Sequence, residues 1–135
     1  MSVFQNVREQ LGTTEQWVES GGVHWLATNG LNVRQVAAVM NEVSARFVTI
    51  TATELSGEPR FSLEYLWDHA AQLLGFRFDI SGNSFESIFD LCEAADWIER
   101  EIHEGFDLDF LGREYEPLLL RSGDKPGVNL HEEVK

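Results

Sequence analysis

Glu99 and His103 are the two side chains whose types and spacing best suit chemistry in this sequence. They stand four residues apart, so they would share one face of a helix and could bind a divalent ion. The same spacing more commonly produces a surface ion pair or hydrogen bond, and we favour that interpretation. Cys92, the single cysteine, could act as a nucleophile with a distant histidine. Its position in an apolar helical pattern favours a small buried side chain instead.

Other catalytic arrangements find less support. The paired glycines at positions 21 and 22 lack the strand–glycine–helix setting that phosphate binding requires. Glu99 and Glu101 are two residues apart, so on a helix they point to different faces and do not form an acid–base pair. No nucleophile, base and orienting group can be named together. The sequence therefore predicts no catalytic residue and no metal ligand.

The composition excludes several classes of protein. Among 135 residues, 23 are acidic and 10 are basic, a formal net charge of −13. Such a chain lacks the clustered basic residues that bind nucleic acid, and an anionic membrane surface would repel it. Hydrophobic residues at 43% are too frequent for a disordered acidic chain. With one cysteine, no long apolar run and no signal-peptide pattern, the sequence predicts a soluble cytoplasmic protein.

The negative charge is concentrated in residues 86–116. This segment holds eleven acidic residues against Arg100 and Arg113, so it carries −9 of the net −13. A solvated helix face is the usual reason for such a run of charge, and a docking surface for a basic partner is the alternative. On the second interpretation, charge reversal at Glu114 and Glu116 should weaken partner binding and leave the fold intact.

Apolar spacing predicts the elements that must position these residues. Helices are expected over residues 2–11, 14–19, 32–45 and 84–102. Strands are expected over residues 23–27, 47–55, 61–67 and 74–80. Asn32 is the expected helix cap, with Gln35 as its capping-box partner.

Short connections should make the last three strands an antiparallel meander. We therefore expect an α+β fold with one domain over residues 1–120. It would hold an antiparallel or mixed sheet of three to four strands with helices packed on one face. Residues 121–135 would form an irregular, polar C-terminal tail.

Residues 93–102 resemble the signature of the C-type subunit of the proton-pumping NADH:quinone oxidoreductase, respiratory complex I. The family pattern is an alanine-rich approach, then Trp, any residue, Glu-Arg-Glu and an aliphatic residue. The residues of this chain that match the pattern are Trp97, Glu99, Arg100, Glu101 and Ile102. The family's upstream Ser-Ile pair and its downstream Phe, aliphatic, Phe and Gly spacing are matched by Ser87, Ile88, Phe106, Leu108, Phe110 and Gly112.

The chain also departs from this family. Asp107 stands where the family has glycine. After Gly112 the family has a basic His-Pro-Asp-Leu-Arg-Arg run, which residues 113–120 of this chain replace with Arg-Glu-Tyr-Glu-Pro-Leu-Leu-Leu. In this respect the chain is more similar to the short relatives in energy-converting, membrane-bound NiFe hydrogenases.

The resemblance implies a non-catalytic subunit of the hydrophilic arm that binds no cofactor. It would dock on the large hydrogenase-like subunit, beside the iron–sulfur small subunit. It would lie at the inner membrane face only through the complex. The residues that the resemblance implies for docking are Trp97, Glu99, Arg100, Glu101, Phe106, Phe110 and Gly112.

Three alternatives stay open at this point. Trp97 and Arg100 could serve only to lock their helix onto the domain's own sheet. The acidic segment could belong to a free-standing binding module or inhibitor of a basic partner. Glu99, His103 or Cys92 could serve a small hydrolase or isomerase. An isolated subunit should also expose an apolar patch beside Trp97, and it could then self-associate.

Overall fold

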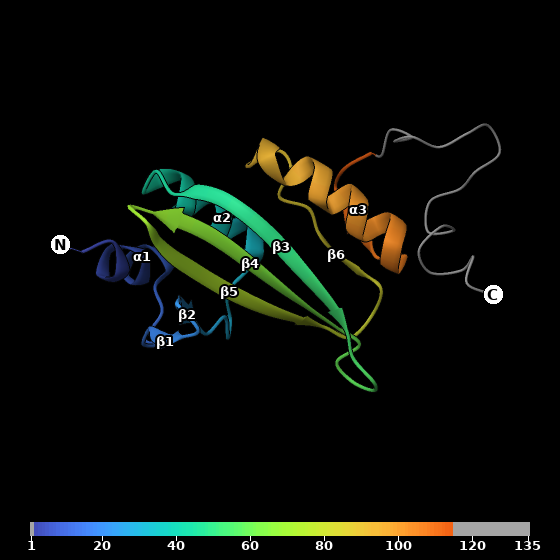
Figure 1. Ribbon diagram of the computed structural model, residues 1–135, viewed down its shortest axis with the longest axis horizontal. Coiled ribbons are helices and arrows are strands. Elements are labelled where there is room, and N and C mark those ends of the chain that lie inside the picture. Colours follow the sequence, from blue (N-terminus) through green and yellow to red (C-terminus); the bar gives the residue numbers. More distant parts are fainter. Residues whose placement is uncertain (1, 115–135) are drawn as a thin grey trace.

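The computed structural model describes residues 2–114, which form one five-stranded sheet, a small two-stranded sheet and three α-helices (Figure 1). The helices are α1 (Val3–Leu11), α2 (Val33–Glu42) and α3 (Asp96–Phe106), with a short 3₁₀ helix η1 (Glu93–Ala95) before α3. The strands are β1 (Val18–Ser20), β2 (Val23–Leu26), β3 (Arg46–Glu54), β4 (Phe61–His69), β5 (Gln72–Ile80), β6 (Ser84–Glu86) and β7 (Asp109–Leu111). The fold is α+β, as expected.

The large sheet has the strand order β1-β2-β5-β4-β3. Its centre is the expected antiparallel meander of β3, β4 and β5, while β2 pairs with β5 in parallel. The sheet has five strands because β1 pairs with β2, and the helical turn expected over residues 14–19 was wrong. Gly21 and Gly22, with φ of 61° and 81°, form a two-residue turn that suits a hairpin and brings these two strands together.

One face of the sheet is buried against the helices. On β4 the side chains of Phe61, Leu63, Tyr65 and Trp67 are at most 1% exposed and alternate with outward-facing residues. They join one apolar cluster with residues of all three helices, so the helices lie on one face as expected. On the opposite face the Trp25 ring lies over Gly75, where an added Cβ would come within 2.6 Å of a ring carbon.

The cap of α2 was predicted correctly, but the capping box was not. The Asn32 side-chain oxygen accepts a hydrogen bond from the Arg34 backbone N–H at 2.7 Å. Gln35 turns away from the cap, and its Nε2 donates to the Leu11 carbonyl at 3.5 Å. This bond connects α2 to α1.

The helix expected over residues 84–102 was wrong in its first half. Residues 84–86 form β6, which pairs in parallel with β7, and α3 begins only at Asp96. Side chains satisfy the backbone donors between these elements: Ser87 Oγ accepts from the Phe89 N–H, and a carboxylate of α3 accepts from the Ile88 N–H. The apolar residues in this loop are spaced as in a helix, although Ile88 reaches the core from a non-helical segment.

No helix in residues 2–114 is long and apolar enough to cross a membrane. The expected boundary at residue 120, the tail over residues 121–135 and Glu116 all lie outside the described residues.

Candidate functional site

Helix α3 carries most of the residues expected to dock a partner, and its sides differ. Glu99 and Ile102 face inward and are 0% and 5% exposed. Trp97 faces outward and is 52% exposed. The helix ends at Asp107, whose φ of 55° is left-handed and whose N–H donates to the His103 carbonyl at 3.1 Å. Glycine adopts this conformation most readily, so Asp107 occupies a position that suits the glycine of the family pattern.

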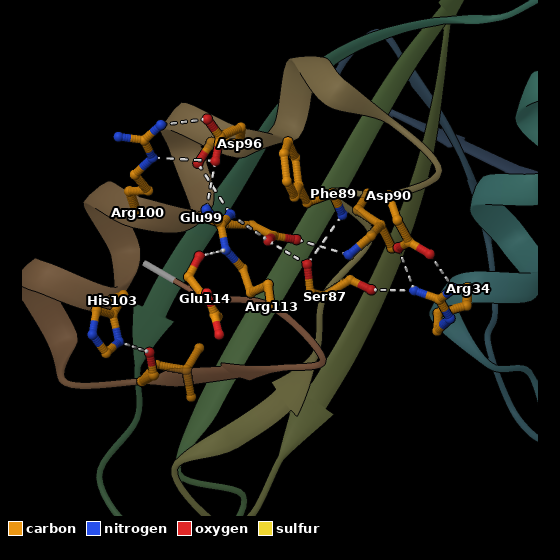
Figure 2. Close-up of polar contacts among 12 residues, drawn as sticks. Arg34, Ser87, Phe89, Asp90, Asp96, Glu99, Arg100, His103, Arg113 and Glu114 are labelled. Carbon is orange, nitrogen blue, oxygen red and sulfur yellow. Dashed lines mark hydrogen bonds and ion pairs between the residues drawn. The ribbon is translucent and has the colours of Figure 1, made fainter. Parts of the chain in front are cut away.

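Glu99 is the buried centre of a polar network (Figure 2). One carboxylate oxygen accepts from Ser87 Oγ at 2.7 Å and from Arg113 Nη1 at 3.1 Å. The other oxygen accepts from the Ile88 N–H at 2.9 Å. Burial raises the pKa of Glu99, while these three donors and the charge of Arg113 oppose that rise. The network therefore holds α3 against the loop that follows β6.

Asp96 joins two arginines to this network. Arg100 donates to both oxygens of its carboxylate, at 3.1 and 2.6 Å, and Arg113 Nη2 donates to one of them at 2.5 Å. The hydrogen bond from Arg100, with help from Arg113, lowers the pKa of Asp96. Arg113 is only 4% exposed, and its guanidinium lies 4.8 Å from the centre of the Phe89 ring. The negative charges of Asp96 and Glu99 are thus compensated by the positive charges of Arg100 and Arg113.

A second ion pair connects α2 to the same loop. Arg34 donates to both oxygens of Asp90 at 2.7 Å and to the Ser87 carbonyl at 2.8 Å. The hydrogen bond from Arg34 lowers the pKa of Asp90, and the pKa of Arg34 rises in return. This pair is more exposed than the Glu99 network, so it should contribute less to stability.

The structure separates the seven docking residues expected from the sequence into three groups by exposure. Glu99 and Phe110 lie in the interior, where a partner cannot touch them in the folded domain. The exposed residues are Trp97, Glu101 and Gly112, and the half-buried ones are Arg100 and Phe106. The Trp97 indole N–H donates to a carboxylate oxygen of Glu101 one turn along α3.

A groove of about 290 Å³ lies beside the exposed tryptophan, between α3 and β3. It is lined by Ile50, Thr51, Ala52, Ile98, Glu101, Ile102 and Phe106. Helix α3 and β3 lie next to each other at this edge of the sheet (Figure 1). The sequence did not reveal this groove because its two walls are about fifty residues apart in the chain.

The residues with catalytic potential are engaged in other contacts. His103 Nδ1 donates to the Leu108 carbonyl at 2.9 Å, and the Glu99 carboxylate is held as described. Burial raises the pKa of Cys92, which disfavours the reactive thiolate. The described residues contain no group of three or more His, Cys, Asp or Glu side chains that could bind a metal ion.

Sequence reasoning missed the roles of Asp96 and Arg113. The four-residue spacing of Asp96 and Arg100 was a visible signal for an ion pair on one helix face. Arg113 gave no such signal, because it follows Glu99 by fourteen residues and reaches it only after the chain has turned through β7.

Comparisons with known proteins agree with the fold and with the sequence resemblance. The chain matches none of the curated proteins. It is similar to a solved structure of the trypsin-resistant fragment (1–134) of Nqo5, with a TM-score of 0.67 and 16% identity over 85% of this chain and 100% of that one. It is also similar to a chain of the membrane-bound sulfane sulfur reductase, an archaeal respiratory membrane complex, with a TM-score of 0.66 and 18% identity over 88% of this chain and 75% of that one.

These structural similarities establish the fold, and a family model identifies the family. The model described as "Respiratory-chain NADH dehydrogenase, 30 Kd subunit" matches residues 28–132, which is most of the chain. The match contains both the α3 motif and the residues that hold it in place. The chain therefore belongs to the family of the 30 kDa subunit of the respiratory-chain NADH dehydrogenase, as the resemblance of residues 93–102 to the C-type subunit of complex I indicated.

Proposed function

We propose that this chain is a non-catalytic structural subunit in the hydrophilic arm of a complex-I-like oxidoreductase. It docks on the large hydrogenase-like subunit and helps to hold that subunit beside the iron–sulfur small subunit. It binds no cofactor itself and reaches the inner face of the membrane only through the complex. Membership of the 30 kDa subunit family supports a place in such a complex.

The exposed Trp97 is the single observation that carries the docking proposal. A tryptophan that is 52% exposed leaves a large, stiff apolar surface in water, and buried tryptophans are frequent anchors of protein interfaces. Its indole N–H donates to Glu101, which lies on the same exposed side of α3. The adjacent groove extends this surface toward β3.

A non-catalytic role is supported by how the polar side chains are used. Glu99 and Arg113 are buried and bonded to each other, so they contribute to holding α3 in place. Trp97 and Arg100 contact side chains of their own helix, Glu101 and Asp96. Arg100 thus belongs to the network around Asp96, which supports a locking role for it, whereas the exposed ring of Trp97 is accessible to a partner.

The experiment is affinity purification of the tagged chain from native membranes, comparing wild type with Trp97→Ala. We expect the variant to fold normally and to lose most of the large hydrogenase-like subunit and the iron–sulfur proteins. Val18→Ala is the matched control, because Val18 is also exposed, at 62%, but lies on β1 at the opposite edge of the sheet. Full recovery with Trp97→Ala would contradict this docking surface, and a wild-type chain purified alone would contradict the function.

The alternative is a free-standing acidic module that binds a basic protein. The charge count of residues 86–116 favoured it, and that count already set Arg100 and Arg113 against the acidic residues. The structure adds one compensating charge from outside the segment, because Arg34 pairs with Asp90. Partner recovery that falls steeply with added salt would support this alternative, whereas the proposed docking through Trp97 should depend weakly on salt.

A further inference from the structure

The groove beside Trp97 lies along β3, whose outer edge pairs with no strand of residues 2–114. β3 is the last strand in the order β1-β2-β5-β4-β3, so only one of its sides pairs with a described strand. Ile50, Thr51 and Ala52 all line the groove. Successive side chains of a strand point to opposite faces, so Ile50 and Ala52 share the face that looks toward α3, and Thr51 lies between them on the other face.

The hydrogen-bond register shows which backbone groups face that edge. In the register of β3 and β4, Leu55 stands opposite Arg60, and its N–H donates to the Arg60 carbonyl at 2.7 Å, as in one half of a hydrogen-bonded pair. The Arg60 N–H donates instead to the Ile80 carbonyl at 2.8 Å. Pairs alternate along an antiparallel ladder, so Thr53 and Thr51 also bond to β4. Ala52, between them, turns its N–H and carbonyl away from β4 toward the outer edge of β3, and the same residue lines the groove.

We propose that an extended segment of another subunit pairs with β3 in this groove, hydrogen-bonding to the backbone of Ala52. Its apolar side chain fits against Ile98, Ile102 and Phe106, and a lysine or arginine next to it pairs with Glu101. This is strand addition at an exposed sheet edge, in which backbone bonds give affinity and side-chain pockets give specificity. The inference rests on the proposed function and names the part of the partner that the surface recognises.

The lining of the groove determines the chemistry of this segment. Glu101 is the one charged side chain among the described residues that line it. One carboxylate oxygen of Glu101 accepts from the Trp97 indole N–H, but a carboxylate can accept several hydrogen bonds. The face of the indole ring also attracts cations.

Proline at Ala52 tests the backbone pairing without breaking the sheet. Proline is tolerated on an edge strand where the N–H faces away from the ladder, so Ala52→Pro should fold but cannot donate to an added strand. Glu54→Pro is the matched control, because Glu54 faces outward in the same register but does not line the groove. Glu101→Lys tests the charge with a surface change that does not touch the backbone.

Each variant is purified with its complex from native membranes. We expect Ala52→Pro and Glu101→Lys to lower recovery of the other subunits at least tenfold, and Glu54→Pro to leave it unchanged. A photo-crosslinking residue at Thr51 should attach to an apolar segment of another subunit that carries a lysine or arginine, identified by mass spectrometry.

The outcomes separate this inference from the proposed function. Wild-type recovery by both groove variants, together with loss in Trp97→Ala, would overturn strand addition and leave docking standing. A crosslink to an acidic segment, or to residues 115–135 of this chain, would also overturn it. Absence of other subunits from wild-type preparations would overturn both.

Discussion

Replacing Arg113 with methionine should destabilise the domain in a way that depends on pH. Arg113 is 4% exposed and bonds to Glu99 at 3.1 Å and to Asp96 at 2.5 Å. Methionine retains much of the packing volume but removes the charge. Glu99, with no exposed surface, would then keep only its neutral donors, from Ser87 and Ile88.

The size of the effect follows from the burial of the pair. Breaking a buried ion pair by removing one partner costs about 3–5 kcal/mol, because the other charge is left without compensation. Asp96 keeps its ion pair with Arg100. We therefore expect Arg113→Met to lower the free energy of unfolding by about 3 kcal/mol at neutral pH, near the lower end of this range. Arg100→Met is the matched control. Its side chain is 20% exposed and pairs within one helix, so it should cost less than about 1 kcal/mol.

The pH dependence gives the sharper test. Burial already raises the pKa of Glu99 above 4.5, and removing Arg113 takes away an interaction that opposes the rise. A carboxyl with a raised folded-state pKa contributes stability that is present below its unfolded pKa and lost as pH rises through the folded value. The cost of Arg113→Met should therefore be larger at pH 7.5 than at pH values near 4.5.

Urea unfolding of wild type and variant at several pH values measures this cost. Glu99→Gln in the same chain as Arg113→Met should recover part of the loss at neutral pH, because no buried charge is then unpaired. A cost below about 1 kcal/mol, or one that is the same at all pH values, would refute the assignment of Glu99 and Arg113 as a buried ion pair.

Three further changes test other parts of the structure. Asp96→Asn should lower the free energy of unfolding most above pH 3.8 and progressively less below it. The arginines lower the folded-state pKa of Asp96, so the stability that its carboxylate contributes is lost as pH falls through that folded-state pKa; urea unfolding at several pH values measures this. Asp107→Gly should raise the unfolding free energy by about 0.5–1 kcal/mol, because the ~1–2 kcal/mol cost of a left-handed residue other than glycine exceeds the ~0.5–1 kcal/mol entropic cost of glycine, and a lowered urea midpoint would contradict it. Gly75→Ala should lower stability by about 1–3 kcal/mol through contact with the Trp25 ring, with a matching change in tryptophan fluorescence.

The meander was predictable because its signal is local. Phe61, Leu63, Tyr65 and Trp67 alternate with polar or less buried residues, and this period of two can arise only from a strand with one buried face. β1 gave no such signal, because all three of its residues are exposed. The pairing of β6 with β7 joins residues 25 positions apart, such as Ser84 and Asp109, and neither three-residue strand has a pattern of its own.

The site was partly predictable for the same reason. Ala95, Glu99 and Ile102 are spaced to share one side of a helix, so the inward position of Glu99 could have been read from its apolar neighbours. Its partners could not, because Ser87 and Arg113 come from separate segments on either side of α3. The part of the expected helix over residues 87–92 shows the opposite error, because core residues of a loop happen to have helical spacing there.

Helical geometry divides the Trp-x-Glu-Arg-Glu motif between two tasks. Trp97 and Glu101 are one turn apart and share the exposed side, whereas Glu99 lies between them on the buried side. A change at Glu99 should therefore lower stability first and partner binding only as a consequence. A change at Trp97 should lower partner binding at unchanged stability. Measuring both quantities for both variants distinguishes the two tasks, because a motif that served only the fold would show no such separation.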